Sequence, residues 1–295
     1  MIEVATTERP GRVRVGISGW RYAGWRGDFY PPGLPHKREL EYVGERMSTL
    51  ELNGSFYSLQ RPASYLRWRG SVPADFVFAV KGSRYVTHML RMKNVDAALA
   101  NFFASGVLAL GDQLGPILWQ LPERQHFEPR SLEAFLSGLP RTTGEALHRA
   151  RRHDARIGDR AWLEVENDRP IRYGFEPRSV TFENDDLLSM LREYDTALVV
   201  SDAAGRWPAF GATTASFVYV RLHGAEELYA SGYTDEQLND WASRIAGWRD
   251  GTSVVDGTPR DVYVYFDNDA RGHAPHDAVA LAQRVGDSRA SRGRN

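Results

Sequence analysis

The stretch FVYVRLH, residues 217–223, alternates two kinds of side chain along its length. Successive side chains of a β-strand point to opposite faces, so Tyr219, Arg221 and His223 share one face and the residues Val218, Val220 and Leu222 share the other. We expect the aliphatic face to pack on helices and the polar face to point away from them. The stretch therefore predicts a strand with polar side chains directed into an enclosed interior.

Seven other short runs resemble this one, and nearly all of the eight end in a polar or charged residue. In chain order the eight runs are VRVGIS (13–18), STLELN (48–53), FVFAVK (76–81), ILWQ (117–120), YGFEPR (173–178), ALVVSD (197–202), FVYVRLH (217–223) and VYVYFDN (262–268). Helix-like stretches lie between most of them, and a repeated strand-then-helix order is typical of a parallel sheet. Eight such units predict an α/β fold, a closed eight-stranded (β/α)8 TIM barrel. Active sites of such barrels gather at the C-terminal ends of the strands, where these polar residues fall.

A single barrel domain accounts for most of the 295 residues, because a (β/α)8 barrel takes about 250 residues. We assign residues 13–285 to the barrel, with an insertion rich in Arg, His and Asp at about 140–168. Residues 1–12 are expected to form an N-terminal extension. Residues 286–295 are expected to be a disordered basic tail, with a weak nucleic-acid arm as the alternative.

The composition excludes several kinds of protein. The chain has no cysteine, which excludes disulfides, thiol nucleophiles and thiolate zinc sites. Its net charge of −1 argues against a general binder of polyanions. No apolar run approaches the ~20 residues that cross a bilayer, and the N-terminus lacks the apolar core of a signal peptide. We therefore expect a cytoplasmic protein that does not bind membranes; its oligomeric state stays open.

Strand alternation predicts a ring of polar side chains at the C-terminal face. The expected members are Glu51, Asn53, Lys81, Gln120, Glu176, Arg178, Asp202, Arg221 and His223, with either Asp267 or Asn268 on the last strand. Lys81 is unusual because the chain has only three lysines against 34 arginines. A desolvated lysine can lose its proton near neutral pH, which an arginine cannot do. The alternative is a structural charge network filling the barrel, in which Glu51 neutralises Arg221 and Lys81 is a salt-bridge partner.

Several loop residues are further candidates. His88 could reach the barrel mouth, or it could be bonded to backbone in its loop. The aromatic loop 19–35 is expected to form a lid over the mouth, and among the aromatic residues on loops we single out Trp20 and Tyr57 as able to stack on a ligand. The segment DNDARGHA (267–274) offers backbone N–H groups at a helix N-terminus, where many barrels hold a phosphate.

Seven segments resemble, in order, the signature of a known family. They are SGWRYAGWRGDFYP, LELNGSFY, FAVKGSRYVTH, LGPILWQLP, FEPRSVTF, YVRLHG and VYVYFDNDARGHAPHDA. Together they are similar to the YecE-like family (domain of unknown function 72), over about residues 13–285. The resemblance implies a TIM barrel and no established activity.

The same resemblance assigns two short motifs to this chain. The Glu-x-Arg of the family falls on Glu176 and Arg178, and its Arg-x-His-Gly begins at Arg221. The chain departs from the family in the long insertion before the fifth strand, and in carrying Asp267 and Asp277 where the family usually has Asn.

The first functional hypothesis is an enzyme acting on a small anionic substrate that is phosphorylated or carboxylated, with hydrolase, lyase and isomerase as the open reaction classes. Lys81, Arg178 and Arg221 would hold the anion, and Glu176 and Asp202 would exchange a proton. The catalytic candidates are Glu176, Asp202, Lys81 and His223; the substrate-binding candidates are Asn53, Gln120, Arg178, Arg221, His88, Asn268, Trp20 and Tyr57. We expect no cofactor and no structural or multinuclear metal, and a single metal ion held by His223, Glu176 and Asp202 stays as an alternative.

Two other functions were weighed against the residues at the strand ends. Barrel nucleases that cleave damaged DNA need several metal ions held by many His and carboxylate ligands, and only His88 and His223 lie near the strand ends here. Binding of nucleic acid without cleavage therefore remains the alternative function. A retaining glycosidase needs carboxylates at the ends of strands four and seven, where this chain has Gln120, Arg221 and His223, so that function is not favoured.

Overall fold

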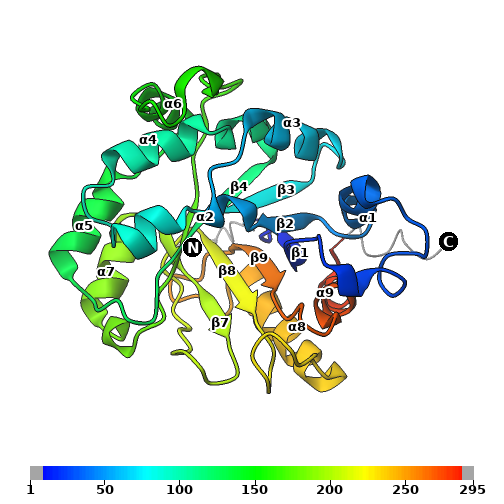
Figure 1. Ribbon diagram of the computed structural model, residues 1–295. Helices are drawn as coiled ribbons and strands as arrows, with labels where there is room; N and C mark the ends of the chain where they lie inside the picture. Colours follow the sequence, from blue (N-terminus) through cyan, green and yellow to red (C-terminus); the bar gives the residue numbers. More distant parts are fainter. Residues whose placement is uncertain (1–8, 288–295) are drawn as a thin grey trace, which may run out of the picture.

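The computed structural model describes residues 9–287, and its strands form one parallel barrel with the helices outside it (Figure 1). The strands are β1 (Val13–Ser18), β2 (Thr49–Leu52), β3 (Val77–Lys81), β4 (Leu114–Gln120), β5 (Tyr173–Glu176), β6 (Thr196–Leu198), β7 (Val200–Asp202), β8 (Phe217–Leu222) and β9 (Asp261–Phe266). They are ordered β6-β5-β4-β3-β2-β1-β9-β8-β7, and every paired neighbour is parallel. The predicted α/β TIM-like barrel is confirmed.

The strand count differs from the expected eight, because nine strands lie in the described part of the chain. The sixth run breaks at Val199 into β6 and β7. Its first half pairs with β5, where Val199 N donates to Phe175 O at 2.9 Å, and its second half pairs with β8, where His223 N donates to Asp202 O at 2.8 Å. The two halves of one run thus bring the ends of the sheet together.

The helices surround the barrel and follow the strands. They are α1 (Glu39–Arg46), α2 (Gly54–Tyr57), α3 (Pro62–Gly70), α4 (Asp96–Ala104), α5 (Pro129–Gly138), α6 (Thr143–Ala150), α7 (Asp185–Glu193), α8 (Asp235–Arg249) and α9 (His273–Val285). Local sequence sets several of their ends: Pro62 and Pro129 occupy first turns, and Thr234 and Gln237 form a capping box on α8. None of the helices in residues 9–287 is both long and apolar enough to cross a membrane.

The barrel interior has an apolar lower part and a polar upper part. The lower part contains Ala79, Leu118, Ala197, Val199, Phe217, Tyr219, Tyr263 and Tyr265. Gly174 leaves room for the Tyr219 ring, since a Cβ there would lie 3.2 Å from it. Above this plug, the Tyr219 hydroxyl donates to Glu51 Oε2 at 2.7 Å. The polar ring therefore sits on an apolar floor that strengthens its electrostatic interactions.

The insertion before β5 lies on the outside of the barrel. It contains α6, where Arg149 pairs with Asp96 of α4 at 2.8 Å. The aromatic loop after β1 lies beside α1 (Figure 1). In this loop Phe29 contacts Tyr42 of α1 and His276 of α9. Trp25 and Tyr30 are buried beside Phe29, so these three aromatic side chains of the loop pack at the side of the barrel.

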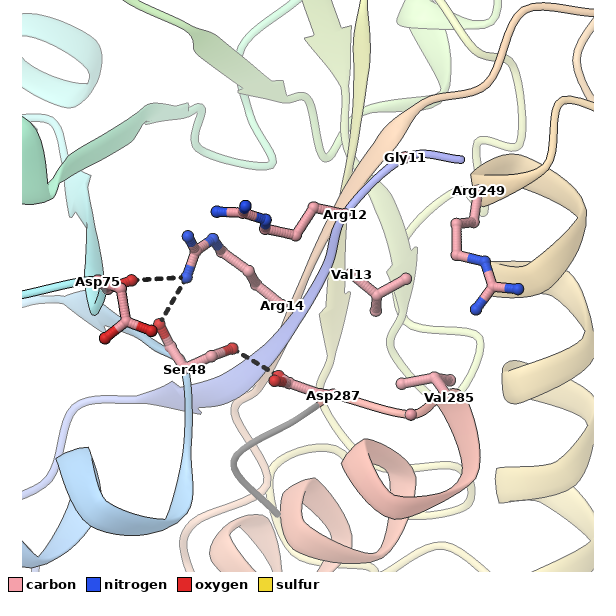
Figure 2. Close-up of a pocket in the computed structure, with 10 residues that line it drawn as sticks. Gly11, Arg12, Val13, Arg14, Ser48, Asp75, Arg249, Val285 and Asp287 are labelled. Atoms are coloured by element: carbon pink, nitrogen blue, oxygen red, sulfur yellow. Dashed lines mark hydrogen bonds between the residues drawn. The ribbon is translucent and has the colours of Figure 1, made fainter. Parts of the chain in front are cut away.

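A cavity of about 380 Å³ opens at the opposite, N-terminal face (Figure 2). Its wall includes Arg14, which donates to the backbone oxygens of Ser48 and Asp75, and Asp287, which accepts from Val15 N at 3.0 Å and from the Ser48 hydroxyl. Residues 286 and 287, which were expected to begin the tail, thus lie at the end of the barrel, where Asp287 is bonded to β1 and to Ser48. The expected N-terminal extension is described only from residue 9, and 288–295 lie outside the described residues.

Replacing Asp287 by alanine is expected to destabilise the fold by about 1–3 kcal/mol, because the buried Val15 amide and Ser48 hydroxyl lose their charged acceptor. Urea unfolding measures this loss. Asp250→Ala is the matched control, since Asp250 forms an exposed pair with Arg249 that should contribute under about 1 kcal/mol. Equal stability of the two variants would show that Asp287 does not tie the end of α9 to β1.

Candidate functional site

Arg221 is the centre of a buried charge cluster at the C-terminal end of the barrel. Its Nε and Nη2 donate to the two carboxylate oxygens of Glu51 at 3.0 and 2.8 Å. Its Nη1 donates to Glu176 Oε2 at 3.0 Å, and Nη2 also reaches Asp267 Oδ2 at 3.0 Å and Ser18 Oγ at 3.3 Å. The Arg221 side chain has no exposed surface. The predicted Glu51–Arg221 pair is confirmed, and Arg221 has no donor left to bind a substrate anion directly.

The carboxylates around Arg221 are held in their charged form. Burial alone would raise the pKa of Glu176, but the charges of Arg178 and Arg221 hold that pKa well below its usual range. Burial likewise opposes ionisation of Asp267, and Arg221 and His223 nevertheless lower its pKa. Neither carboxylate therefore changes protonation near neutral pH.

His223 lies between two of these carboxylates and under an aromatic cover. Its Nε2 is 3.4 Å from Glu176 Oε1 and its Nδ1 is 3.0 Å from Asp267 Oδ2, although Nδ1 lacks a well-aligned hydrogen bond within residues 9–287. The rings of Trp207 and Tyr229 stand edge-on to the imidazole at 5.3 and 5.4 Å. Trp207 follows β7 and Tyr229 follows β8, so loops of the sixth and seventh units supply this cover.

Lys81 ends β3 and differs from the other cations of the cluster. Its Nζ makes no ion pair or hydrogen bond among the described residues and lies 4.6 Å from the centre of the Phe56 ring. Burial and the charge of Arg221 lower the pKa of Lys81 to about 8, even though Glu51 and other carboxylates act in the opposite direction. Lys81 therefore has an amine that can gain or lose a proton near neutral pH.

Arg178 and His88 flank the opening beside Lys81. The Arg178 guanidinium lies 3.6 Å above the Trp207 ring, Nη2 donates to Glu176 Oε1 at 3.2 Å, and Nε has no partner within the described chain. Burial, followed by the charges of Arg84, Lys81 and Arg178, lowers the pKa of His88 to about 4. His88 is thus a neutral side chain in positively charged surroundings.

Other predicted site residues line the edges of this cluster. Asn53 Nδ2 donates to Ser18 Oγ at 2.8 Å, and Gln120 lies opposite Glu176 with its amide donating to Leu121 O. Trp20 and Asn53 line a cavity of about 330 Å³ between the loops after β1 and β2. Tyr57 is 71% exposed on α2. These residues therefore surround the cluster without bonding to Arg221.

Asp202 and Asn268 do not join the cluster, which corrects their predicted place. In β7 it is Ser201 that lies beside Arg221, so Asp202 points outward, where it accepts from the Tyr233 hydroxyl at 3.1 Å. Asn268 also points outward and donates to Asp277 Oδ2 at 2.8 Å. The position of a polar residue at the end of a strand does not by itself show whether its side chain points inward or outward. Side chains alternate along a strand, and the register of the strand sets which of them point inward.

Four residues of the site were missed or left open by sequence reasoning. They are Ser18, Ser201, Trp207 and Asp267. Ser18 could have been found from the alternation of β1, and Asp267 from Tyr263 and Tyr265 on the same face. Trp207 carried no signal, because its position depends on a loop without regular structure.

The described part of the chain holds no group of three or more His, Cys, Asp or Glu side chains arranged to bind a metal ion. The three residues considered for a single metal are separated, since His223 and Glu176 face inward and Asp202 faces outward. What the geometry defines is a parallel barrel with a buried cluster of one arginine and three carboxylates at its C-terminal face. Two further cations, Lys81 and Arg178, lie at the opening.

Comparison with known proteins gives the family. The model of the family described as protein of unknown function DUF72 matches residues 14–294, and the chain belongs to this family. The chain is 23% identical over 248 residues to the UPF0759 protein YecE of Escherichia coli K12, an alignment covering 82% of this chain and 84% of that protein. It is 28% identical to the UPF0759 protein YunF of Bacillus subtilis 168, over 75 residues that make up 26% of that protein.

Solved structures of the same family share the fold. A DUF72 family protein from Thermotoga maritima has a TM-score of 0.70 and 21% identity, with 93% of this chain and 99% of that chain covered. A DUF72 family protein from Enterococcus faecalis has a TM-score of 0.68 and 14% identity, with 93% and 95% covered. At these identities the likeness concerns the fold alone.

Proposed function

We propose that this protein is an enzyme that acts on a small anionic substrate at the C-terminal face of the barrel. The proposal rests on one observation: the three cations there, Arg221, Lys81 and Arg178, differ in how many of their donors are bonded to protein groups. Arg221 is fully bonded to Glu51, Glu176 and Asp267, whereas Lys81 has no ionic partner within residues 9–287 and Arg178 has an unused Nε. The three cations and the three carboxylates balance in formal charge, but Lys81 and Arg178 keep unused donors at the opening that a negatively charged ligand can bind.

Arg178 is the residue proposed to bind the anion. Its guanidinium lies over the Trp207 ring and donates one hydrogen bond to Glu176, so its position is set before a ligand arrives. An arginine with free donors suits a carboxylate or a phosphate, which it can bind through two parallel hydrogen bonds. Arg221 is a positioning residue in this proposal, because it keeps Glu176 ionised and fixes it against Arg178.

Lys81 is proposed to transfer the proton. Glu176 and Asp267 stay ionised, so they are poor proton donors at neutral pH. A general base works best when its pKa lies near the working pH, and the Lys81 amine with a pKa of about 8 meets this condition. Abstraction of a proton next to an anionic group is the step of many lyases and isomerases, which are the reaction classes we favour.

The test is anion binding by wild-type protein and by Arg178→Ala. Phosphate, sulfate and small carboxylates, each at about ten times its Kd, are expected to raise the melting temperature of wild type by about 2–4 °C. Arg178→Ala should lose this response. Arg244→Ala is the matched control, because Arg244 also stacks on a tryptophan, Trp241, but on the outer side of the barrel.

The proposal fails if no anion stabilises wild type, or if Arg178→Ala responds as wild type does. A short DNA duplex serves as a second ligand in the same assay. Stabilisation by DNA alone, lost as salt is added, would instead favour the nucleic-acid alternative.

A further inference from the structure

We propose that Lys81 forms a Schiff base with a small carbonyl compound that carries a carboxylate or phosphate group. This inference rests on the proposed function and names its substrate class and its covalent step.

The position of Lys81 leaves its amine available for reaction. The residue is 9% exposed, so the amine is largely shielded from water but still reaches the mouth of the barrel. A structural lysine in this place would bond to a carboxylate, yet Glu51 and Glu176 are both bonded to Arg221 instead. Within the described residues, the Lys81 amine lies near the face of the Phe56 ring and has no ion pair with an acid.

The surroundings also favour the nucleophilic form of the amine. A lysine becomes a nucleophile when it is desolvated or lies near another cation, because both conditions favour the uncharged amine. Lys81 meets both, and its pKa is lowered to about 8 by burial and by Arg221. At pH 7.5 about a quarter of such amines are uncharged, against about one in a thousand for an ordinary lysine.

The negative group of the substrate follows from the neighbours of Lys81. Lys81 ends β3 and Glu176 ends β5, on either side of β4, and Arg178 donates to Glu176 Oε1 at 3.2 Å. A ligand with its carbonyl carbon at the Lys81 amine can therefore place an anionic group toward Arg178, whose Nε is unused within residues 9–287. A neutral carbonyl compound would leave that donor without a partner.

The covalent step balances without a cofactor. The uncharged amine attacks the carbonyl carbon, the C=O π electrons move to oxygen, and a carbinolamine forms. Both amine hydrogens then leave with that oxygen as one water molecule, and the C=N bond of the Schiff base is formed. Its protonated form withdraws electrons from the neighbouring carbon and so eases loss of a proton there. Because the Lys81 nitrogen is then bonded to the substrate, the proton goes to the ionised Glu176 carboxylate in this route and not to Lys81.

The chain allows a clean test because it has only three lysines, Lys37, Lys81 and Lys93. Full-length protein is incubated with pyruvate, dihydroxyacetone phosphate or acetone, then reduced with cyanoborohydride and mapped by peptide mass spectrometry. With the two anionic probes, Lys81 is expected to gain the mass of the probe less one oxygen atom. Its labelling should exceed that of Lys93 by at least about tenfold at neutral pH and should rise as the pH passes 8.

Variants at two of these lysines complete the test. Lys81→Arg and Lys81→Met should lose the adduct, while Lys93→Arg should keep it, because Lys93 is exposed and paired with Glu128. Equal labelling of all three lysines overturns the inference, and so does an unlabelled Lys81 in wild type. If phosphate still stabilises wild type through Arg178 in that case, the Schiff base fails while the proposed function stands.

Acetone carries no negative group, so it tests whether the Schiff base requires an anionic substrate. Labelling of Lys81 by acetone as strong as by pyruvate would support the Schiff base and overturn the anionic part of the substrate. The proposed anion function would then fall with it, whereas much weaker labelling by acetone supports both.

Discussion

Arg221→Met is expected to lower the free energy of unfolding by about 3–5 kcal/mol near pH 7.5. The change removes the cation that bonds Glu51, Glu176 and Asp267, and it leaves these carboxylates buried without that partner. Urea unfolding followed by circular dichroism measures the loss. Arg172→Met is the matched control, because Arg172 also faces the interior but is 33% exposed and pairs with Asp261 near the other face. Its removal should cost about 1 kcal/mol or less.

The loss in Arg221→Met should depend on pH in a definite direction. In wild type the pKa values of Glu176 and Asp267 are lowered, so the stability they provide is present above about pH 4 and is lost as the pH falls through their folded values. Without Arg221 both pKa values rise, because burial is then opposed by fewer positive charges. The variant gains less stability than wild type as the pH rises above about 4, so the gap to wild type should be smaller at pH 4.5 than at pH 7.5. A gap that stays constant would show that the pairing with Arg221 does not govern these carboxylates.

Lys81→Met is expected to stabilise the fold by up to about 3 kcal/mol at pH 7, while it removes the proposed reaction. The reason is that the folded state lowers the pKa of Lys81 from 10.5 to about 8, and each unit corresponds to about 1.4 kcal/mol. The unfolded chain binds more protons between these two values. The cost of burying the ammonium is therefore full below pH 8 and disappears as the pH rises toward 10.5.

Urea unfolding of Lys81→Met and wild type at pH 7 and pH 9.5 measures this difference, which should shrink at the higher pH. Lys93→Met should show no measurable change, because its side chain is 56% exposed. A Lys81→Met protein that is less stable than wild type at pH 7 would mean that the amine makes a net favourable interaction. Stability gained together with function lost is what a site kept for chemistry should show.

The local sequence was sufficient to predict the barrel and much of the polar ring. Alternation along FVYVRLH correctly directed Arg221 and His223 inward, and it paired Arg221 with Glu51. Alternation follows from the backbone geometry of each strand, so it does not depend on what packs around the strand. The family resemblance agreed with this fold and added no activity.

Only the tertiary structure decided which neighbours complete the site. The break at Val199 sets the register that puts Ser201, and not Asp202, beside Arg221, and the pairing of β9 with β8 turns Asp267 inward and Asn268 outward. Trp207 reaches His223 from a loop without helix or strand, so no local pattern marked it. The different roles of Arg221 and Lys81 are also set by the tertiary structure. Three acids from different strands surround Arg221, and Lys81 is left without an ion pair within residues 9–287. Registers and long-range contacts depend on the packing of the whole barrel, whereas alternation depends only on the backbone of one strand.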